Sequence, residues 1–365
     1  MSETNTTPQR SQDIDIAKGI GILLVVFGHN WIVSHQAGTL YQVIFSFHMP
    51  LFFFLSGVFL TPDRGWSQNI RQKADSLLKP YFVVLLVLAV YYMVPMRHFS
   101  PDYFIGLLFA TGQSILWIPL WFLPNLFLAQ LIAIMLLKLF PRTRENTGWL
   151  ALMILVLLMI GIQTLHAGHD IRLLTLELLP GETRRTIGLP WGLDIVLLNT
   201  AFLLAGFLSA RKVKEPAHLA LPMLLGGGAV FALLHLLYDD TLNLNGRLYD
   251  STLISSLAAF TGIYMTIGLS SLLSRTKRVA NILAYLGSAS LFIFIFHSYC
   301  QGKTSGSLLN AFPQYPNLAG WLGFIAGVVI PIAIFEVCRH SRLLSAAMLP
   351  SVRIPARHAR ASTAA

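Results

Sequence analysis

Residues 15–29 read DIAKGIGILLVVFGH, and the apolar run that they begin continues to residue 34. A helix needs about 20 mostly apolar residues to cross a membrane, so residues 14–34 predict a first membrane span. Two ionisable residues, Lys18 and His29, interrupt this span eleven residues apart. A rotation of about 100° per residue places both side chains on one helix face, separated by roughly 16 Å along the axis.

This pair of side chains is the first candidate for a functional site. Ionisable groups inside a membrane are costly, and their presence indicates function by default. The simpler alternative is that Lys18 extends to the inner interface and that His29 is a hydrogen-bonded core residue. We favour function because both share one face, next to Gly19, Gly21 and Gly28, where another helix or a ligand can approach closely.

The rest of the chain repeats this apolar pattern. The 365 residues are 55% hydrophobic and 12% charged, with a mean hydropathy of +0.64, whereas soluble proteins are about one-quarter charged. This composition excludes a soluble enzyme, a disordered chain and a collagen-like fibre. The two cysteines form neither a disulfide framework nor a CxxC metal site. Ten apolar segments are expected, at residues 14–34, 40–60, 80–96, 119–140, 148–165, 191–209, 219–237, 251–273, 281–300 and 319–338.

We therefore predict an all-α fold, a polytopic membrane helix bundle of about ten transmembrane helices. The apolar residues 103–118 are interrupted by polar ones, and we expect them to be re-entrant or interfacial. Residues 14–338 are expected to form one membrane domain, between an N-terminal tail at 1–13 and a basic C-terminal tail at 339–365 that lies against anionic lipid.

The distribution of positive charge predicts the orientation in the membrane. Lys and Arg gather in loops that face the cytosol. With the N-terminus inside, nineteen of them fall in the inner segments and six in the outer ones. Both termini are therefore expected in the cytosol. The same rule accounts for the net charge of +10, so we expect no nucleic-acid partner.

Two more histidines are expected at the depth of His29. His48 falls in the outer half of the second span, near the helix-kinking Pro50, and His297 ends the apolar run of the ninth. Three histidines suggest a metal site as an alternative, but no HExxH or i,i+4 pair accompanies them. We expect no metal and favour a general base, because histidine titrates near neutral pH and can accept the proton of an attacking hydroxyl.

Four motifs resemble the acyltransferase 3 family of integral membrane O-acyltransferases. Residues 15–29 are similar to its opening motif, and residues 45–57, FSFHMPLFFFLSG, to its second-helix motif. Residues 120–123 (LWFL) and 287–297 (GSASLFIFIFH) match later landmarks. The resemblance covers nearly the whole chain and implies a ten-helix fold, a cytosolic acyl-CoA donor and a carbohydrate acceptor.

Two positions depart from the family pattern. Many members carry Arg where this chain has Lys18, which keeps the charge and loses the bidentate fork. Many also carry Arg-x-x-Arg before a Pro-Tyr pair, whereas here KADS, residues 73–76, precedes the pair at 80–81, with Arg71 nearby. The lysine variants resemble the branch of fucose 4-O-acetylases and exopolysaccharide acetyltransferases.

These observations predict an acetyl-CoA-dependent O-acetyltransferase of the bacterial inner membrane. Catalysis is assigned to His29, which would deprotonate a sugar hydroxyl, with Lys18 near the mouth of a donor channel and Asp15 or another carboxylate setting up charge nearby. Arg71 and Lys73 would bind the phosphates of the acetyl-CoA donor. The acceptor side is assigned to His48, His297, Trp121 and Asn125.

The acceptor is expected to be an exopolysaccharide or lipid-linked glycan, with a xanthan-like repeat unit as our first choice. Expected partners are membrane lipids and other polysaccharide biosynthesis proteins. Two alternatives stay open: an O-succinyltransferase, and a transporter or flippase for a lipid-linked sugar, since interrupted helices and midplane charges occur in transporters too. The lack of paired broken segments in the two halves of the sequence argues against the transporter.

Overall fold

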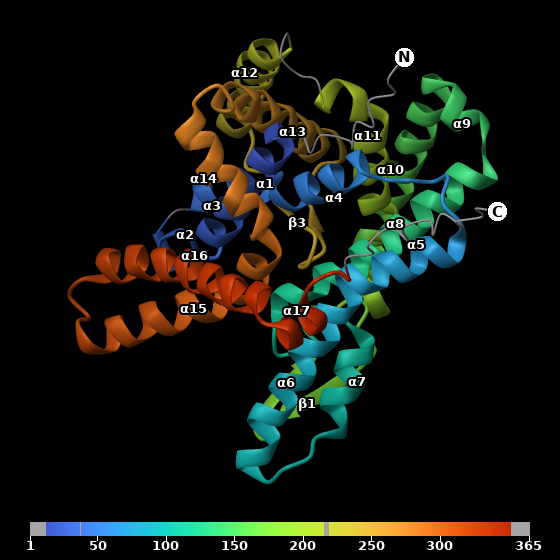
Figure 1. Cartoon of the computed structure of the whole chain (residues 1–365). Coiled ribbons are helices and arrows are strands. Elements are labelled where there is room, and N and C mark those ends of the chain that lie inside the picture. Colours follow the sequence, from blue (N-terminus) through green and yellow to red (C-terminus); the bar gives the residue numbers. More distant parts are fainter. Residues whose placement is uncertain (1–11, 37, 215–218, 352–365) are drawn as a thin grey trace, which may run out of the picture.

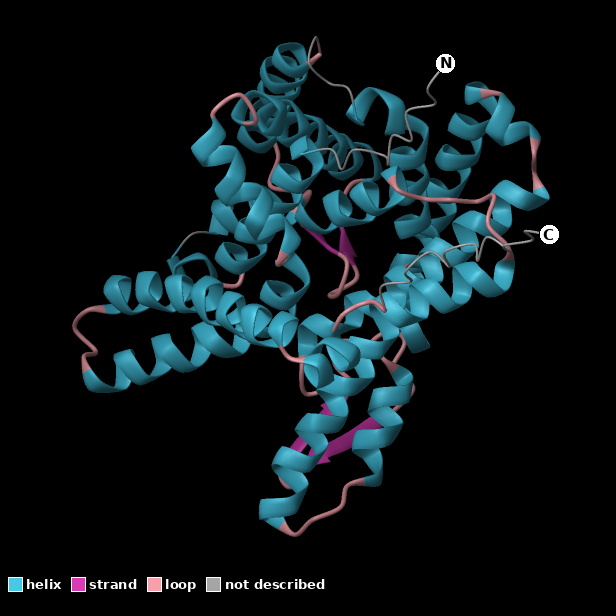
Figure 2. Cartoon of the chain, in the orientation of Figure 1, coloured by secondary structure: helices cyan, strands magenta, loops and turns pink. Residues whose placement is uncertain are grey.

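Helices make up 77% of the computed structural model, which describes residues 12–36, 38–214 and 219–351. Figure 1 shows the arrangement of the helices, and Figure 2 shows how little of the chain is strand. The first half contains α1 (Gln12–Gly28), α2 (Trp31–Gln36), α3 (Gly38–Phe45), α4 (His48–Val58), α5 (Trp66–Lys73), the π-helical turn η1 (Ala74–Leu78), α6 (Lys79–Met96), α7 (Pro101–Phe109), the 3-10 turn η2 (Ile118–Trp121), α8 (Phe122–Leu139), α9 (Arg142–Glu145) and α10 (Thr147–His169).

Two short antiparallel hairpins, β1–β2 and β3–β4, interrupt the helices of the second half. The elements of this half are β1 (Thr175–Leu179), β2 (Glu182–Arg185), the 3-10 turn η3 (Pro190–Gly192), α11 (Val196–Lys214), α12 (Ala220–Leu237), β3 (Leu242–Asn243), β4 (Leu248–Tyr249), α13 (Thr252–Leu273), α14 (Lys277–Ser288), α15 (Ser290–Ala311), α16 (Pro316–His340) and α17 (Arg342–Met348).

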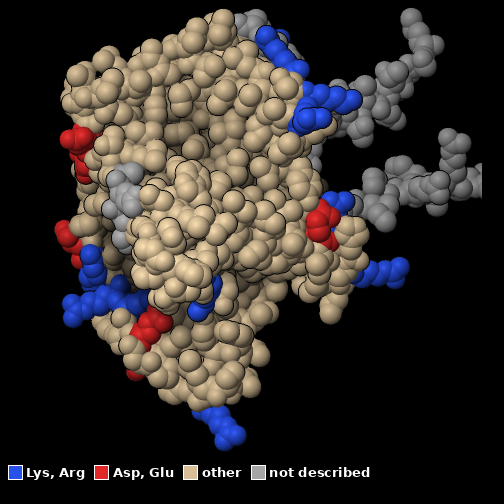
Figure 3. Space-filling model, turned by 90° about the vertical axis from the view of Figure 1, so that its left-hand side faces the viewer, with Lys and Arg blue, Asp and Glu red and all other residues tan. Residues whose placement is uncertain are grey.

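The predicted polytopic helix bundle is confirmed. Among the described residues, eight helical stretches are long and apolar enough to cross a membrane, and α14 with α15 makes a ninth if this bent pair is one span. The remaining predicted segment, the first at residues 14–34, corresponds to α1, which has 17 residues. Residues 103–118 form the nine-residue α7 and a non-helical stretch, too short to span. Figure 3 shows a face on which charged side chains lie mainly toward the margins, as a lipid-facing surface requires.

The first span differs from the prediction, because α1 does not continue through His29. The helix ends at Gly28, and His29 and Asn30 form a turn before α2, although the His29 amide still donates to the Val25 carbonyl at 3.2 Å. The reason is local: the Asn30 side chain accepts a hydrogen bond from the Ile32 amide at 3.0 Å and so caps α2. The backbone turns where this cap begins a new helix.

The second and ninth spans are also broken. Ser46 and Phe47 separate α3 from α4, as expected for Pro50, which has no N–H to donate to the carbonyl of Ser46 and clashes with it. The expected helix at 281–300 is divided at Ala289, where α14 and α15 meet at 77°. The Ser288 hydroxyl donates to the Tyr285 carbonyl at 2.7 Å, which competes with helical continuation.

Glycines bring α1 into direct backbone contact with α14. A Cβ at Gly19 would lie 2.1 Å from the Leu283 carbonyl oxygen, and a Cβ at Gly287 would lie 1.9 Å from that of Asp15. The first helix therefore uses part of its glycine face for another helix, one of the two roles expected for it. It also packs against α4, α13 and α15, which places α1 at the centre of the bundle (Figure 1).

The segments that connect the spans form two groups on opposite sides of the bundle, and side-chain contacts occur within each group. On one side, the ammonium groups of Lys18 and Lys214 lie 5.0 and 5.5 Å from the ring centre of Phe59. On the other side, the Gln42 amide donates to the Asp239 carbonyl at 2.9 Å. These groups agree with the alternation predicted from Lys and Arg. We call them the basic side and the hairpin side, and the cytosolic placement of the basic side stays a prediction.

Part of the predicted C-terminal tail is folded against the bundle. Helix α16 ends at His340 and α17 follows, with Met348 only 6% exposed. The Lys79 ammonium donates to the Leu349 carbonyl at 2.5 Å. Residues 1–11 and 352–365, which make up most of both predicted tails, lie outside the described residues.

Candidate active site

Three histidines from distant segments meet at the C-terminal end of α1. His29 follows α1, His48 is the first residue of α4, and His297 lies in α15. The ring centres of His29 and His297 are 5.4 Å apart, while Phe45 lies 5.4 Å from His29 and 4.7 Å from His48. We call this group the histidine cluster. The structure therefore brings together the three histidines that the sequence places at similar depth.

The turn that presents His29 is held on both sides. A Cβ at Gly28 would come within 3.0 Å of a side chain of α3, so only glycine fits there without displacing it. Asn30 is 1% exposed, and besides capping α2 it donates from Nδ2 to the Gly320 carbonyl of α16 at 2.9 Å. The side chain of His29 itself is exposed, so it can reach a reactant from a fixed backbone.

The other two histidines are buried and oriented by backbone carbonyls. Nδ1 of His48 lies 2.8 Å from the Ile44 oxygen, and Nδ1 of His297 lies 2.8 Å from the Phe294 oxygen. A carbonyl can only accept, so both Nδ1 atoms must carry the proton and both Nε2 atoms are acceptors in the neutral ring. Among the described residues, Nε2 of His297 has no hydrogen-bond partner although it is buried. This buried acceptor belongs to the ring that lies 5.4 Å from the ring of His29.

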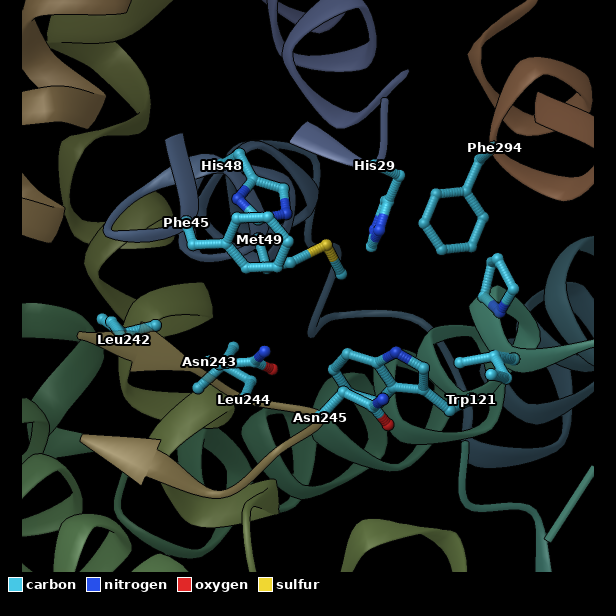
Figure 4. A pocket seen from close by; sticks show the side chains of 12 residues that line it. His29, Phe45, His48, Met49, Trp121, Leu242, Asn243, Leu244, Asn245 and Phe294 are labelled. Carbon is cyan, nitrogen blue, oxygen red and sulfur yellow. The ribbon is translucent and has the colours of Figure 1, made fainter. Parts of the chain in front are cut away.

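A small cavity of about 70 Å³ lies beside His29 and His48. Figure 4 shows these two side chains on one side of it, with Trp121 and the β3–β4 hairpin opposite. Its remaining lining is apolar apart from two amides. The lining residues are His29, Phe45, His48, Met49, Ile118, Pro119, Trp121, Leu242, Asn243, Leu244, Asn245 and Phe294.

Lys18 and Asp15 lie toward the opposite end of α1. Nζ of Lys18 is 3.8 Å from Oδ1 of Asp15, whose side chain is buried. Eleven residues of helix separate Lys18 from His29, and neither Lys18 nor Asp15 lines the cavity. The structure therefore places Asp15 beside Lys18 rather than beside His29.

A second pocket opens on the basic side and contains both residues assigned to the donor. Arg71 and Lys73 line it together with Arg64, and its volume is about 810 Å³. Ligand pockets commonly have about 300–1,000 Å³, so this pocket can hold a cofactor-sized molecule whereas the cavity at His29 cannot. Asp75 also lines it, but this carboxylate is paired with Lys79 at 2.7 Å. The pocket therefore suits an anion.

The two remaining residues assigned to the acceptor have different positions. Trp121 is 7% exposed and lines the cavity (Figure 4). Asn125 lies outside it, because its Nδ2 donates to the carbonyls of Trp191 and Gly192 at 3.0 and 2.9 Å, and its Oδ1 accepts from Asn199 at 2.7 Å. Asn125 holds the η3 turn in place.

Sequence reasoning missed the β3–β4 hairpin and the ion pair that anchors it. Nε of Arg247 donates to Oδ2 of Asp194 at 2.8 Å, and each side chain is 1% exposed. In the sequence, Arg247 counts only as one of the few positive charges of the outer loops. No local pattern joins it to Asp194, 53 residues away, so no motif could have identified the pair.

A family model described as an acyltransferase domain matches residues 11–336, which includes every residue assigned to the site above. No curated protein and no solved structure matches the chain. Among the described residues, no group of three or more His, Cys, Asp or Glu side chains is arranged to hold a metal ion. The chain therefore belongs to the acyltransferase 3 family, and it is a multi-pass membrane acyltransferase.

Proposed function

We propose that this acyltransferase moves an acetyl group from acetyl-CoA to a sugar hydroxyl of an exopolysaccharide or lipid-linked glycan in a bacterial inner membrane, with a xanthan-like unit as the first choice of acceptor. The observation that supports this proposal is the presence of two different pockets. An exposed His29 faces a small cavity beside the β3–β4 hairpin, and a large pocket on the basic side is lined by Arg64, Arg71 and Lys73. In this proposal the phosphates of CoA occupy the basic pocket, and its acyl thioester lies at the small cavity.

The chemistry needs one general base. His29 takes the proton of the acceptor hydroxyl while the oxygen attacks the carbonyl carbon of the thioester, and the C–S bond of the donor breaks. The proton then passes from His29 to the leaving thiolate, so the products are an acetate ester and CoA. His29 is the histidine for this step because it is exposed, whereas His48 and His297 are 1% and 0% exposed. The His297 ring contacts the ring of His29, and His48 lines the cavity.

The cavity favours acetyl over succinyl as the transferred group. The cavity is small, about 70 Å³, so it suits an acetyl group beside the reacting edge of a sugar better than a longer acyl group. None of the residues that line it is Lys or Arg, so the carboxylate of a succinyl group would lose its hydration with no counter-charge. Trp121 and two asparagine amides provide the apolar face and the hydrogen bonds that a sugar needs.

The large basic pocket is proposed as the site for the phosphates of acetyl-CoA. Arg64, Arg71 and Lys73 supply three positive charges there. Arginine binds phosphate through its planar fork and lysine as a point charge. The positive-inside rule places this side of the protein in the cytosol, where acetyl-CoA is made available.

Replacement of His29 tests the proposal most directly. Membranes that contain the protein, supplied with labelled acetyl-CoA, should transfer label to glycan, and His29→Ala should reduce the rate by about 10²–10⁴-fold because the general base is lost. The amount of protein in the membrane should stay close to that of the unmodified protein, because the His29 side chain is exposed and, among the described residues, only its ring contacts with Phe45 and His297 are lost.

His98→Ala is the matched control, because His98 is an exposed histidine in a loop on the hairpin side, between α6 and α7. Its activity should equal that of the unmodified protein. Equal activity of the His29→Ala and His98→Ala proteins would refute the proposed mechanism. A lack of label in glycan with the unmodified protein would refute acetyl transfer itself.

A further inference from the structure

The β3–β4 hairpin forms one wall of the cavity beside the histidine cluster. Four consecutive residues, 242–245, contribute to the lining, and the hairpin is distant in sequence from all three histidines. Figure 4 shows Asn243 and Asn245 across the cavity from His29 and His48. A reactant in the cavity therefore lies between the general base and the hairpin.

The amide of Asn245 is confined at this wall. A Cβ at Gly112, in the segment after α7, would lie 2.3 Å from Oδ1 of Asn245 and 2.8 Å from Nδ2. Within the described part of the chain, Oδ1 of Asn245 is buried without a hydrogen-bond partner. An unsatisfied buried amide atom is costly, and Asn245 also lines the cavity, so a reactant there can supply the missing hydrogen bond when the amide turns toward it.

The backbone at Asn245 is held by a buried ion pair. Nη1 of Arg247 donates to the Asn245 carbonyl oxygen at 2.8 Å, while Nε and Nη2 of Arg247 donate to the two carboxylate oxygens of Asp194 at 2.8 and 3.3 Å. Asp194 Oδ1 also accepts from the Leu189 amide at 2.9 Å. One guanidinium thus joins the residue at the cavity wall to the segment before α11.

Backbone segments approach the Arg247–Asp194 ion pair closely. Arg247 has φ = 57°, a left-handed conformation that is strained for a residue with a Cβ. A Cβ at Gly168 would lie 2.3 Å from Oδ2 of Asp194, and one at Gly188, where φ is 75°, would lie 2.5 Å from the same atom. Such strain persists only where the surroundings determine the conformation.

Two further contacts fasten the hairpin. The Asn243 amide donates to the Tyr41 hydroxyl at 2.8 Å, and Nε2 of His166 donates to the Tyr249 carbonyl at 2.8 Å. Burial raises the pKa of Tyr249, so its hydroxyl stays neutral in the hydrogen bond with Ser256 at 2.7 Å. The hairpin is therefore a rigid wall.

We propose that the side-chain amide of Asn245 hydrogen-bonds a hydroxyl of the acceptor sugar next to the hydroxyl that is acylated, and that Arg247 and Asp194 are positioning residues that hold Asn245 in place. Asn245 would thereby select sugars with a neighbouring hydroxyl. This inference rests on the proposed function, because it names the acceptor side of the same reaction.

The first test replaces the amide. The acceptor probe is a dilution series of lipid-linked glycans extracted from the host membranes, and the donor is labelled acetyl-CoA. Asn245→Ala should raise the half-saturating extract concentration about tenfold, the effect of one lost hydrogen bond. The KM for acetyl-CoA should stay unchanged, because the basic pocket is untouched.

A second variant displaces the amide without removing it. In Gly112→Ala, the new methyl group must push the end of the Asn245 side chain away, which is a small change for the backbone. This variant should show the same rise for the acceptor as Asn245→Ala. Gly226→Ala is the control, since a Cβ there meets nothing within 4 Å, and it should behave like the unmodified protein.

A third variant asks whether Arg247 acts through Asn245. Arg247→Lys keeps the charge beside Asp194 but cannot bond both the carboxylate and the Asn245 carbonyl through one planar fork. It should raise the acceptor requirement about fivefold. The double variant Asn245→Ala/Arg247→Lys should need no more extract than Asn245→Ala alone, whereas independent roles would multiply to about 50-fold.

Each outcome separates this inference from the proposed function. If the unmodified protein transfers no label, the proposed function is wrong. If the unmodified protein transfers label and Asn245→Ala saturates at the same extract concentration, Asn245 does not bind the acceptor. Multiplying effects in the double variant, or an equal rise in the KM for acetyl-CoA, would show that Arg247 only stabilises the fold and would overturn its positioning role.

Discussion

The two sides of the molecule hold their ion pairs in opposite ways. On the hairpin side, Arg247 and Asp194 are each 1% exposed, and both side chains also bond to backbone atoms. On the basic side, Arg144 pairs with Asp63, and these side chains are 35% and 77% exposed. The buried pair has one geometry, whereas the exposed pair exchanges readily with water and salt. A site that distinguishes one hydroxyl from another needs a fixed geometry, which the buried pair provides.

The two pockets differ in the same way. The cavity at His29 has about 70 Å³, and its buried His48 ring is held by the Ile44 carbonyl, while the basic pocket has about 810 Å³ and is lined mainly by charged and polar side chains. A flexible carrier can be held by charge at the basic side, but the reacting atoms must be aligned at the cavity. The difference supports the proposal that the hairpin side selects the acceptor and the basic side binds the donor.

The largest expected effect is the loss of the buried pair. Arg247→Met leaves the Asp194 carboxylate buried without its partner, which should destabilise the protein by about 3–5 kcal/mol. Arg144→Met removes the exposed pair and should change the stability by about 0–1 kcal/mol. Thermal unfolding of both variants in detergent measures this contrast. Equal melting temperatures of the two variants would show that the sides do not differ as described.

A smaller effect is expected at the basic pocket. Arg71→Ala with Lys73→Ala should raise the KM for acetyl-CoA about tenfold and lower kcat less, because the phosphates are bound equally in the ground and transition states. The difference in KM between the double variant and the unmodified protein should become smaller as the salt concentration is raised, because salt screens the charges that the variant lacks. Initial rates over a range of acetyl-CoA concentrations measure it.

The control for the basic pocket is Arg142→Ala, an exposed charge on the same side that does not line the pocket. Its KM for acetyl-CoA should match that of the unmodified protein. An unchanged KM in the Arg71/Lys73 variant would mean that the charges of this segment serve only membrane orientation.

The smallest effect is expected at Lys18. Its ammonium group lies 5.0 Å from the Phe59 ring centre, a contact typically worth about 0.5–1 kcal/mol at exposed sites. Lys18 lines neither pocket, so Lys18→Ala should lower kcat/KM less than the Arg71/Lys73 double variant, and Lys18→Arg should retain most of the activity because the charge is kept. A Lys18→Arg protein no more active than Lys18→Ala would show that the shape of the side chain, and not its charge, is required.

Much of the fold could be predicted because hydropathy is a local property. Each apolar segment predicts a membrane span without reference to the rest of the chain. The histidines at 29, 48 and 297 could be placed at one depth by counting residues. The prediction that the first helix continues to residue 34 was wrong, because the Asn30 side chain caps a new helix there. The assignments of Arg71 and Lys73 to a donor site stay predictions, although the structure places both in one pocket.

What could not be predicted depends on contacts between distant residues. Arg247 and Asp194 are 53 positions apart, and neither lies in a recognisable motif. Asn245 looks in the sequence like an ordinary turn residue, and only its position across from His29 (Figure 4) gives it a candidate role. Asn125 shows the opposite case: a polar residue in a predicted span that holds the η3 turn.

The hydrogen bond from Asn30 to Gly320 has a consequence for how the protein is made. The turn that carries His29 is synthesised well before its partner in α16, which lies 290 residues further along the chain. His297 also arrives late, in α15. A nascent chain that has inserted its first helices therefore holds the general base without its final support. We therefore expect the turn at His29 to reach its final geometry only after α16 has entered the membrane.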